Sequence, residues 1–186
     1  YLSLSGGESV TPLSTAYFGR MNLSVKQQYP FAFGSINYLF NASWQWGNVP
    51  YVLLDYPAGN EGGDYSFYRF NLMNYMEYAA DRYAGLHTEI ITNGILFNHI
   101  PLVNKLNLRE VVSFKTSYGS LNNNHANLMD LPASGIYTYN KPYAEAGIGI
   151  TNILGIFMVQ SVWRLTDLNH SGISPWALKA AIRVTF

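Results

Sequence analysis

Hydrophobic and polar residues alternate along several stretches of this chain, most regularly in its last eleven residues. From Trp176 to Phe186, one side of an extended strand would carry only apolar residues, and Lys179 and Arg183 would lie on the other side. A stretch of this length that ends on the aromatic Phe186 is typical of a membrane-spanning β-strand, with Phe186 as the C-terminal signal of a barrel. We therefore expect apolar side chains toward lipid and polar ones toward a barrel interior.

The same alternation recurs upstream and predicts an all-β fold: a transmembrane antiparallel up-and-down β-barrel, formed by the whole chain, residues 1–186. The predicted strands are 1–5, 16–28, 35–46, 83–97, 110–120, 143–151, 157–166 and 176–186. Outer-membrane barrels keep short turns on the periplasmic side and long loops outside. The short connections 29–34 and 152–156 and the long ones 47–82 and 121–142 fall on alternate ends, as this rule requires. Residues 98–108 form a longer periplasmic link.

Composition agrees with a membrane barrel and excludes other classes. Charged residues make up 12% of the chain and aromatic residues 16%, which suits a lipid-facing surface with aromatic girdles at the two interfaces. No run approaches the roughly 18 to 20 consecutive apolar residues of a spanning helix. The net charge is +0 and there is no long basic run, so nucleic acid is not an expected partner. The absence of Cys excludes disulfides and thiolate chemistry.

Eight strands leave two architectures open. One is a closed eight-stranded barrel with a lumen filled by side chains. The other is one part of a larger barrel. The chain begins inside a predicted strand, and residues 47–82 are unusually long for a loop. Both features favour the second architecture.

Two blocks carry a family resemblance: Phe70-Asn-Leu-Met-Asn74 and Asn104-Lys-Leu-Asn-Leu-Arg-Glu-Val111. With these blocks, most of residues 35–186 resembles the C-terminal part of a Bacteroidetes-type family of outer-membrane proteins. Its members join an N-terminal carboxypeptidase-regulatory-like domain to a barrel related to the BamA-type insertase and translocase superfamily. The resemblance implies a barrel of sixteen strands, of which this chain would be the C-terminal half.

The resemblance also implies a role for the long segment. In the superfamily, the loop before the fifth strand from the end folds back into the lumen, and residues 47–82 hold that position here. The superfamily's loop carries an Arg-Gly-aromatic signature, whereas this chain has Tyr68-Arg69-Phe70, without the Gly. We expect the segment to be lumen-directed and held partly by Glu77, Asp81 or Arg82.

Charged residues of the segment and of the inward strand faces are the candidate site. They are Arg69, Glu77, Asp81, Arg82, Glu89, Glu110, Lys115, Arg164, Lys179 and Arg183. Such charges could lock the segment or gate a path through the barrel. The interpretation that we favour is that they are ordinary paired charges that fill the interior.

Catalytic and metal sites are not expected. No Ser/His/Asp arrangement has the spacing of a known motif. The four His residues are too scattered to suggest a metal site; they are His87, His99, His125 and His170. We therefore predict neither an enzyme nor a cofactor. Trp44, Trp46, Trp163 and Trp176 lie near strand ends and are assigned to an aromatic belt.

Three function classes remain open. The first is an insertase- or translocase-related protein in the outer membrane of a Gram-negative bacterium, acting in envelope protein assembly or translocation or as a subunit of a larger complex. The second is a passive structural barrel or narrow pore, and the third is a barrel enzyme. The expected partners are outer-membrane lipid and other envelope proteins.

Overall fold

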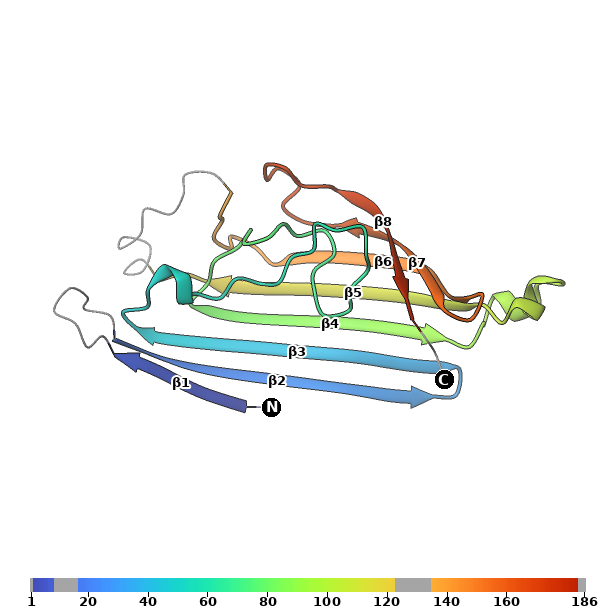
Figure 1. Cartoon of the computed structure of the whole chain (residues 1–186), viewed down its shortest axis with the longest axis horizontal. Helices are drawn as coiled ribbons and strands as arrows, with labels where there is room; N and C mark the ends of the chain where they lie inside the picture. The colour runs from blue at the N-terminus through green and yellow to red at the C-terminus, as the bar shows by residue number, and fades with distance from the viewer. Residues whose placement is uncertain (1, 9–16, 123–134, 184–186) are drawn as a thin grey trace.

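Eight antiparallel strands form one continuous sheet in the computed structural model, in the order β1 to β8 (Figure 1). The structure describes residues 2–8, 17–122 and 135–183. The strands are β1 (Leu2–Glu8), β2 (Tyr17–Phe31), β3 (Gly34–Gly47), β4 (Arg82–Thr92), β5 (Arg109–Ser120), β6 (Tyr143–Ile153), β7 (Phe157–Arg164) and β8 (Trp176–Ile182). Each strand pairs with its neighbours in sequence, which confirms the predicted all-β, up-and-down arrangement.

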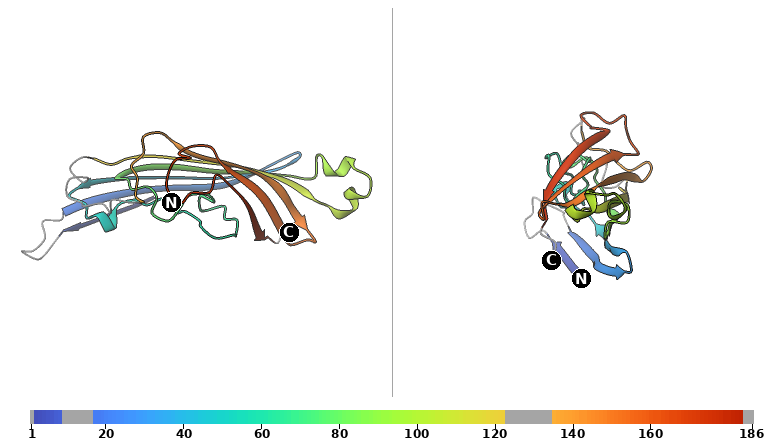
Figure 2. Two further views of the ribbon diagram at one scale, coloured as in Figure 1. Left: turned by 90° about the horizontal axis from the view of Figure 1, so that it is seen from above. Right: turned by 90° about the vertical axis from the view of Figure 1, so that its right-hand side faces the viewer.

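The sheet curves but does not close on itself (Figure 2). Within the described residues, β1 and β8 are the two edges, and no pairing joins them. The closed eight-stranded barrel is therefore not the observed arrangement. A β-bulge between Ile150 and Ile153 shifts the register of β6 against β7. Bulges bend a strand and increase its local twist.

The two faces of the sheet differ as the alternation predicts. We call inner the face that carries Lys115, Glu145 and Lys179, whose side chains are buried. The outer face is the opposite one, with exposed apolar residues such as Phe114 and Leu178. Because successive residues of a strand point to opposite sides, polar residues gather on one face and apolar ones on the other.

The connections also differ between the two ends of the sheet. The turn between β2 and β3 lies at the same end as residues 93–108 and the turn between β6 and β7, while the segments after β3, β5 and β7 leave from the other end (Figure 1). We call these the turn end and the long-connection end. The predicted alternation of short and long connections is thus present.

Strand β4 ends at Thr92, earlier than the predicted residue 97. Gly94 adopts a left-handed conformation with φ of 78°, which an extended strand cannot accommodate. Two short 3-10 helices follow, Phe97–His99 and Val103–Leu106. The carboxylate of Glu110 accepts hydrogen bonds from the backbone N–H groups of residues 95, 96 and 97, which stabilises the turn.

Helices contribute little to the fold. One further 3-10 helix, Tyr51–Leu53, follows β3. Across the ranges that the structure describes, we find no helix long and apolar enough to span a membrane. The observed strand β8 stops at Ile182, and the predicted terminal Phe186 lies outside the described residues.

Candidate functional site: the inner segment and its anchors

The connection between β3 and β4, residues 48–81, lies across the inner face of the sheet (Figure 1); we call it the inner segment. Its side chains form much of the buried core. Phe70, Met73 and Tyr78 pack together with Tyr143 of β6 in one cluster. In two further hydrophobic clusters, residues of the inner segment pack against the sheet or against other connections. Aromatic side chains bury large areas, so this segment is held by apolar contact as well as by polar groups.

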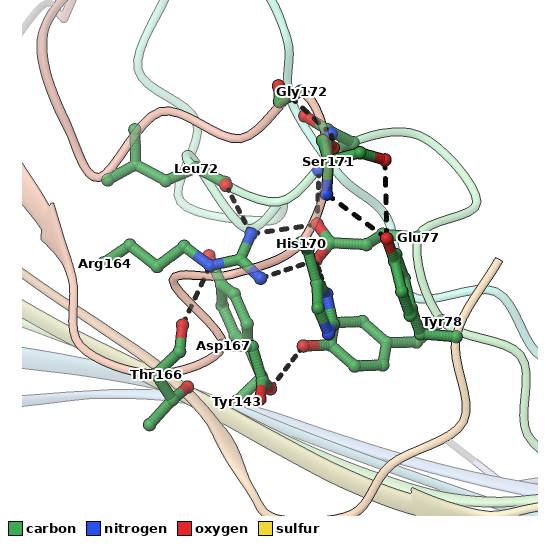
Figure 3. A network of polar contacts seen from close by, with 12 residues as sticks. Leu72, Glu77, Tyr78, Tyr143, Arg164, Thr166, Asp167, His170, Ser171 and Gly172 are labelled. Carbon is green, nitrogen blue, oxygen red and sulfur yellow. Dashed lines mark hydrogen bonds and ion pairs between the residues drawn. The ribbon is translucent and has the colours of Figure 1, made fainter. Parts of the chain in front are cut away.

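Glu77 and Arg164 form the most buried ion pair (Figure 3). Their side chains are 1% and 0% exposed. The pair is bidentate, with N–O distances of 2.9 and 2.5 Å. Arg164 also donates to the Leu72 carbonyl at 3.2 Å. An arginine fork suits a carboxylate in this way, and the extra bonds compensate for part of the cost of burying the two charges.

The connection before β8 contributes a third group to this ion pair. The Nδ1 atom of His170 lies 2.7 Å from the Glu77 carboxylate. Its ring stacks on Tyr137, with centroids 3.6 Å apart. Nearby, the Tyr78 hydroxyl donates to the Asp167 carboxylate at 2.5 Å (Figure 3). The inner segment is thus joined to two other connections at the long-connection end as well as to the sheet.

Glu77 makes the docking of the inner segment sensitive to pH. Burial alone would raise the pKa of Glu77, but hydrogen bonds from Arg164 and other donors outweigh it and lower the pKa below the ordinary 4.5. The folded state therefore binds the proton less well than the unfolded state. Its stabilisation by Glu77 is complete above about pH 4.5 and is lost as the pH falls through the lowered pKa.

We expect the inner segment to loosen as the pH falls below about 4.5. A dye on a Cys substituted for the exposed Tyr75 should then show falling fluorescence anisotropy. In the Glu77→Gln variant this acid transition should be absent, because the titrating group is gone. An identical transition in that variant would assign the effect to another group.

Lys115 and Glu145 anchor the middle of the segment. They are direct partners on β5 and β6 and lie 3.8 Å apart, both buried. Lys115 donates to the carbonyls of Ser66 and Arg69. Glu145 accepts from the backbone N–H groups of residues 71 and 72, at 2.7 and 2.9 Å. The sheet therefore holds the backbone of the segment through charge-assisted hydrogen bonds, whose partners do not depend on side-chain identity.

The segment also covers the edge of the sheet at β8. The N–H of Tyr65 donates to the Ala180 carbonyl at 2.7 Å, and the N–H of Ala180 donates to the Gly63 carbonyl at 3.2 Å. The buried Lys179 donates to the carbonyls of Asn60 and Gly62. An uncovered strand edge presents unpaired backbone groups and invites association, so this cover protects β8 at one position.

Glu89 and Asp55 are two further anchor points. Glu89 of β4 accepts from the Tyr65 hydroxyl at 2.9 Å and from both terminal nitrogens of Arg183, at 2.8 and 3.1 Å. At the start of the segment, the Asp55 carboxylate pairs with Arg20 of β2. Ser43 and Gln45 of β3 also donate to Asp55. Burial raises the pKa of Asp55, and these donors oppose that shift.

The structure thus brings together six of the ten residues that the sequence singled out. Glu77, Glu89, Lys115, Arg164, Lys179 and Arg183 all contact the inner segment or one another on the inner face. Asp81 is buried and accepts from the N–H of Asn122, which ties the segment to the connection after β5. Arg69 pairs with Asp64 inside the segment at 2.6 Å, with both side chains partly exposed.

Arg82 and Glu110 do not belong to the inner network, and for these two residues the prediction needs correction. Arg82 is the first residue of β4 and shares its outer face with Ala84; its guanidinium lies over the Trp44 ring, 4.9 Å from the centroid. Glu110 shares the outer face of β5 with Val112 and holds the turn described above. Both follow the period-2 alternation, which places every second residue on the opposite face.

Sequence reasoning did not identify Asp55, Tyr65 and His170 as partners of the network. All three lie in connections, where no alternation indicates direction. Aspartate is mostly exposed in proteins, and tyrosine and histidine occur both buried and exposed, so residue type carries no signal either. Residue types likewise do not indicate which backbone carbonyls accept hydrogen bonds from Lys115 and Lys179.

The arrangement is that of a docked structural element. In the described part of the chain, no group of three His, Asp or Glu side chains is placed to hold a metal ion. A cavity of about 390 Å³ remains between the inner segment and β8, lined in part by Asn60, Met73 and Lys179. Charged residues of six strands, β2 and β4 to β8, contact groups of the inner segment. The geometry can therefore fix the segment strongly or release it when a charge is lost.

Comparison with protein families assigns the chain to one family. Residues 2–129, more than half of the chain, match the model described as "Family of unknown function (DUF5686) C-terminal domain". The chain belongs to this family. No curated protein and no solved structure matches it at a significant level.

Proposed function

We propose that this chain forms part of the wall of an outer-membrane β-barrel, with the inner segment lying in the barrel interior. The observation that carries the proposal is the chemistry of the outer face. Along β2 to β8, the charged residues on this face are Arg82 and Glu110, each at or next to a strand end. Charges near mid-bilayer are costly in a membrane barrel, whereas charges at its rims are tolerated.

Two rows of exposed aromatic side chains border the outer face. The row at the long-connection end is Trp44, Trp46, Tyr118, Trp163 and Trp176, and the row at the turn end is Tyr29, Phe31, Phe33 and Phe157. Met21 pairs with Trp44, and Phe31 lies ten residues further along β2, about 33 Å away in an extended strand. With the usual tilt of barrel strands this becomes about 25 Å, the height of the apolar band in outer-membrane barrels.

The inner face favours a barrel whose interior is partly filled rather than an open pore. An interior that is polar and occupied by a folded-back segment is found in plugged barrels. Further strands could pair with β1, and with β8 outside Ala180, which is consistent with a barrel of more than eight strands. For these reasons we prefer a gated or braced barrel over a passive narrow pore.

The more specific proposal is a role in assembly or translocation of envelope proteins, alone or within a larger outer-membrane complex of a Gram-negative bacterium. Its support is the resemblance to the BamA-type superfamily, including the position of the inner segment before the fifth strand from the end. On the same resemblance, we also propose that the full-length protein has an N-terminal carboxypeptidase-regulatory-like domain.

Membrane insertion can be tested with single introduced cysteines, because the chain has none of its own. An environment-sensitive dye on Cys substituted for Ile148, on the outer face of β6, should be quenched by lipids that carry a nitroxide on the acyl chain. A dye at Leu102, exposed in the connection between β4 and β5, should not be quenched. Equally fast labelling of both positions by a membrane-impermeant reagent, in outer-membrane fragments accessible from both sides, would refute the proposal.

The assembly role needs a separate experiment in cells. Depletion of the full-length protein should lower the amounts of other outer-membrane proteins. An unchanged outer-membrane proteome would argue against assembly or translocation. If planar bilayers with the intact protein also showed a steady conductance, the passive pore would be the better description.

A further inference from the structure

The outer face carries a groove at the long-connection end of β3, β4 and β5. Two hollows of about 220 and 270 Å³ lie side by side and share Ala84 and Tyr118 in their linings. Trp44 and Arg82 line the first hollow, and Phe40 lines the second. We call these two hollows together the outer groove.

The residues across the three strands explain why the groove exists. Ala84 on β4 pairs with Ala42 on β3 and with Tyr118 on β5. The two alanines leave a low strip, and the larger Phe40, Trp44 and Tyr118 rise around it. The walls are apolar side chains on the face that carries no charge at mid-strand. An extended apolar chain fits such a shape and chemistry.

Arg82 provides charge complementarity at one end of the groove. Its side chain is exposed, and it forms no ion pair within the parts of the chain that the structure describes. The guanidinium lies over the Trp44 ring, 4.9 Å from its centroid. This cation–π contact engages no oxygen acceptor, so the N–H groups of the guanidinium can hold phosphate oxygens.

The depth of Arg82 points to a lipid. Arg82 is the direct partner of Trp44 on β3, and Tyr118 lies two residues along β5 from its other partner, Ser120. These aromatic side chains place Arg82 near the level where interfacial aromatics meet headgroups. We propose that the outer groove binds one acyl chain of a phosphate-bearing lipid, with the phosphate held by Arg82. This inference rests on the proposed function, because it requires the outer face to lie in a bilayer. A basic side chain near the membrane surface attracts anionic headgroups.

Native mass spectrometry of the full-length protein in non-ionic detergent, titrated with phosphatidylglycerol, tests the site. Arg82→Gln should weaken retention of the first bound lipid about fivefold, the effect of one basic side chain near an anionic surface. Ala84→Leu should also weaken it, because the larger side chain fills the groove. Ala146→Leu, the same change on the outer face of β6, is the matched control and should bind as the wild type.

Two further measurements distinguish recognition of the lipid headgroup from binding of the acyl chains alone and from binding of free phosphate. Diacylglycerol with the same acyl chains should bind the wild type and Arg82→Gln equally. Inorganic phosphate at the same concentration should not displace phosphatidylglycerol; displacement would mean that Arg82 is a phosphate site without lipid specificity and would overturn the inference. So would wild-type retention of phosphatidylglycerol in both Arg82→Gln and Ala84→Leu. If the Ile148 dye is quenched by lipid in that case, the proposed function stands and this inference alone fails.

Discussion

Replacing Arg164 by Met is expected to destabilise the folded protein by about 3 to 5 kcal/mol, because the substitution leaves the Glu77 carboxylate buried without its partner. The pair is almost fully shielded from water, so solvent cannot compensate for the loss. The change is best measured by urea unfolding in detergent, followed by tryptophan fluorescence. A loss below about 1 kcal/mol would mean that water reaches Glu77 and that the segment is not tightly docked.

Two variants make this measurement specific. Arg69→Gln removes an ion pair of the same segment whose side chains are 35% and 55% exposed, and it should cost no more than about 1 kcal/mol. In the double variant Arg164→Met with Glu77→Gln, part of the stability should return, because no uncompensated charge remains in the interior. If the double variant were less stable than Arg164→Met alone, the unpaired charge would not be the cause.

Replacing Ile148 by Arg should destabilise the membrane-inserted protein by about 2 to 4 kcal/mol, the cost of a cationic side chain near the bilayer midplane of a barrel. Ile148 is 55% exposed on the outer face of β6, between the two aromatic rows. Equilibrium folding into lipid vesicles with increasing denaturant measures this quantity.

The depth dependence provides the control for this second prediction. Tyr118→Arg introduces the same charge in the aromatic row at the long-connection end, where the cost should fall to about 0 to 1 kcal/mol. In water, both substitutions on an exposed surface would be nearly neutral. Equal and small effects at the two positions would therefore place the outer face in solvent and contradict the proposed membrane location.

Much of the sheet was predictable because its period-2 pattern depends on local sequence. The alternation in Trp176 to Ile182 places Lys179 inward and Leu178 outward, and the structure agrees. The same reasoning assigned Lys115 and Arg164 to the inner face. Strand ends were harder to predict: the apolar run after Thr92 continues the pattern, but the left-handed Gly94 interrupts the strand.

The candidate site was predictable only as a list of charges and not as a set of pairs. Alternation indicates which strand residues face inward, but the position of a connection along the face decides which partners they meet. Lys115 binds backbone carbonyls of the inner segment as well as the neighbouring carboxylate. A carbonyl acceptor cannot be predicted from residue type, because every residue has a backbone carbonyl. Arg82 was misassigned because it was counted in the connection 47–82, whereas it begins β4 on the outer face. Glu110 was misassigned because it was grouped by charge, whereas its strand position places it on the outer face.

Gly63 and Tyr65 occupy the backbone groups of Ala180 that point away from β7. A strand added to this edge of the sheet would need the same two groups to form its own ladder. Docking of residues 63–65 and strand addition at Ala180 are therefore competing equilibria, linked through one residue. While the docked state predominates, a change that weakens only docking favours strand addition by the same free energy. The affinity of this edge for a new strand therefore depends on the contacts of the inner segment.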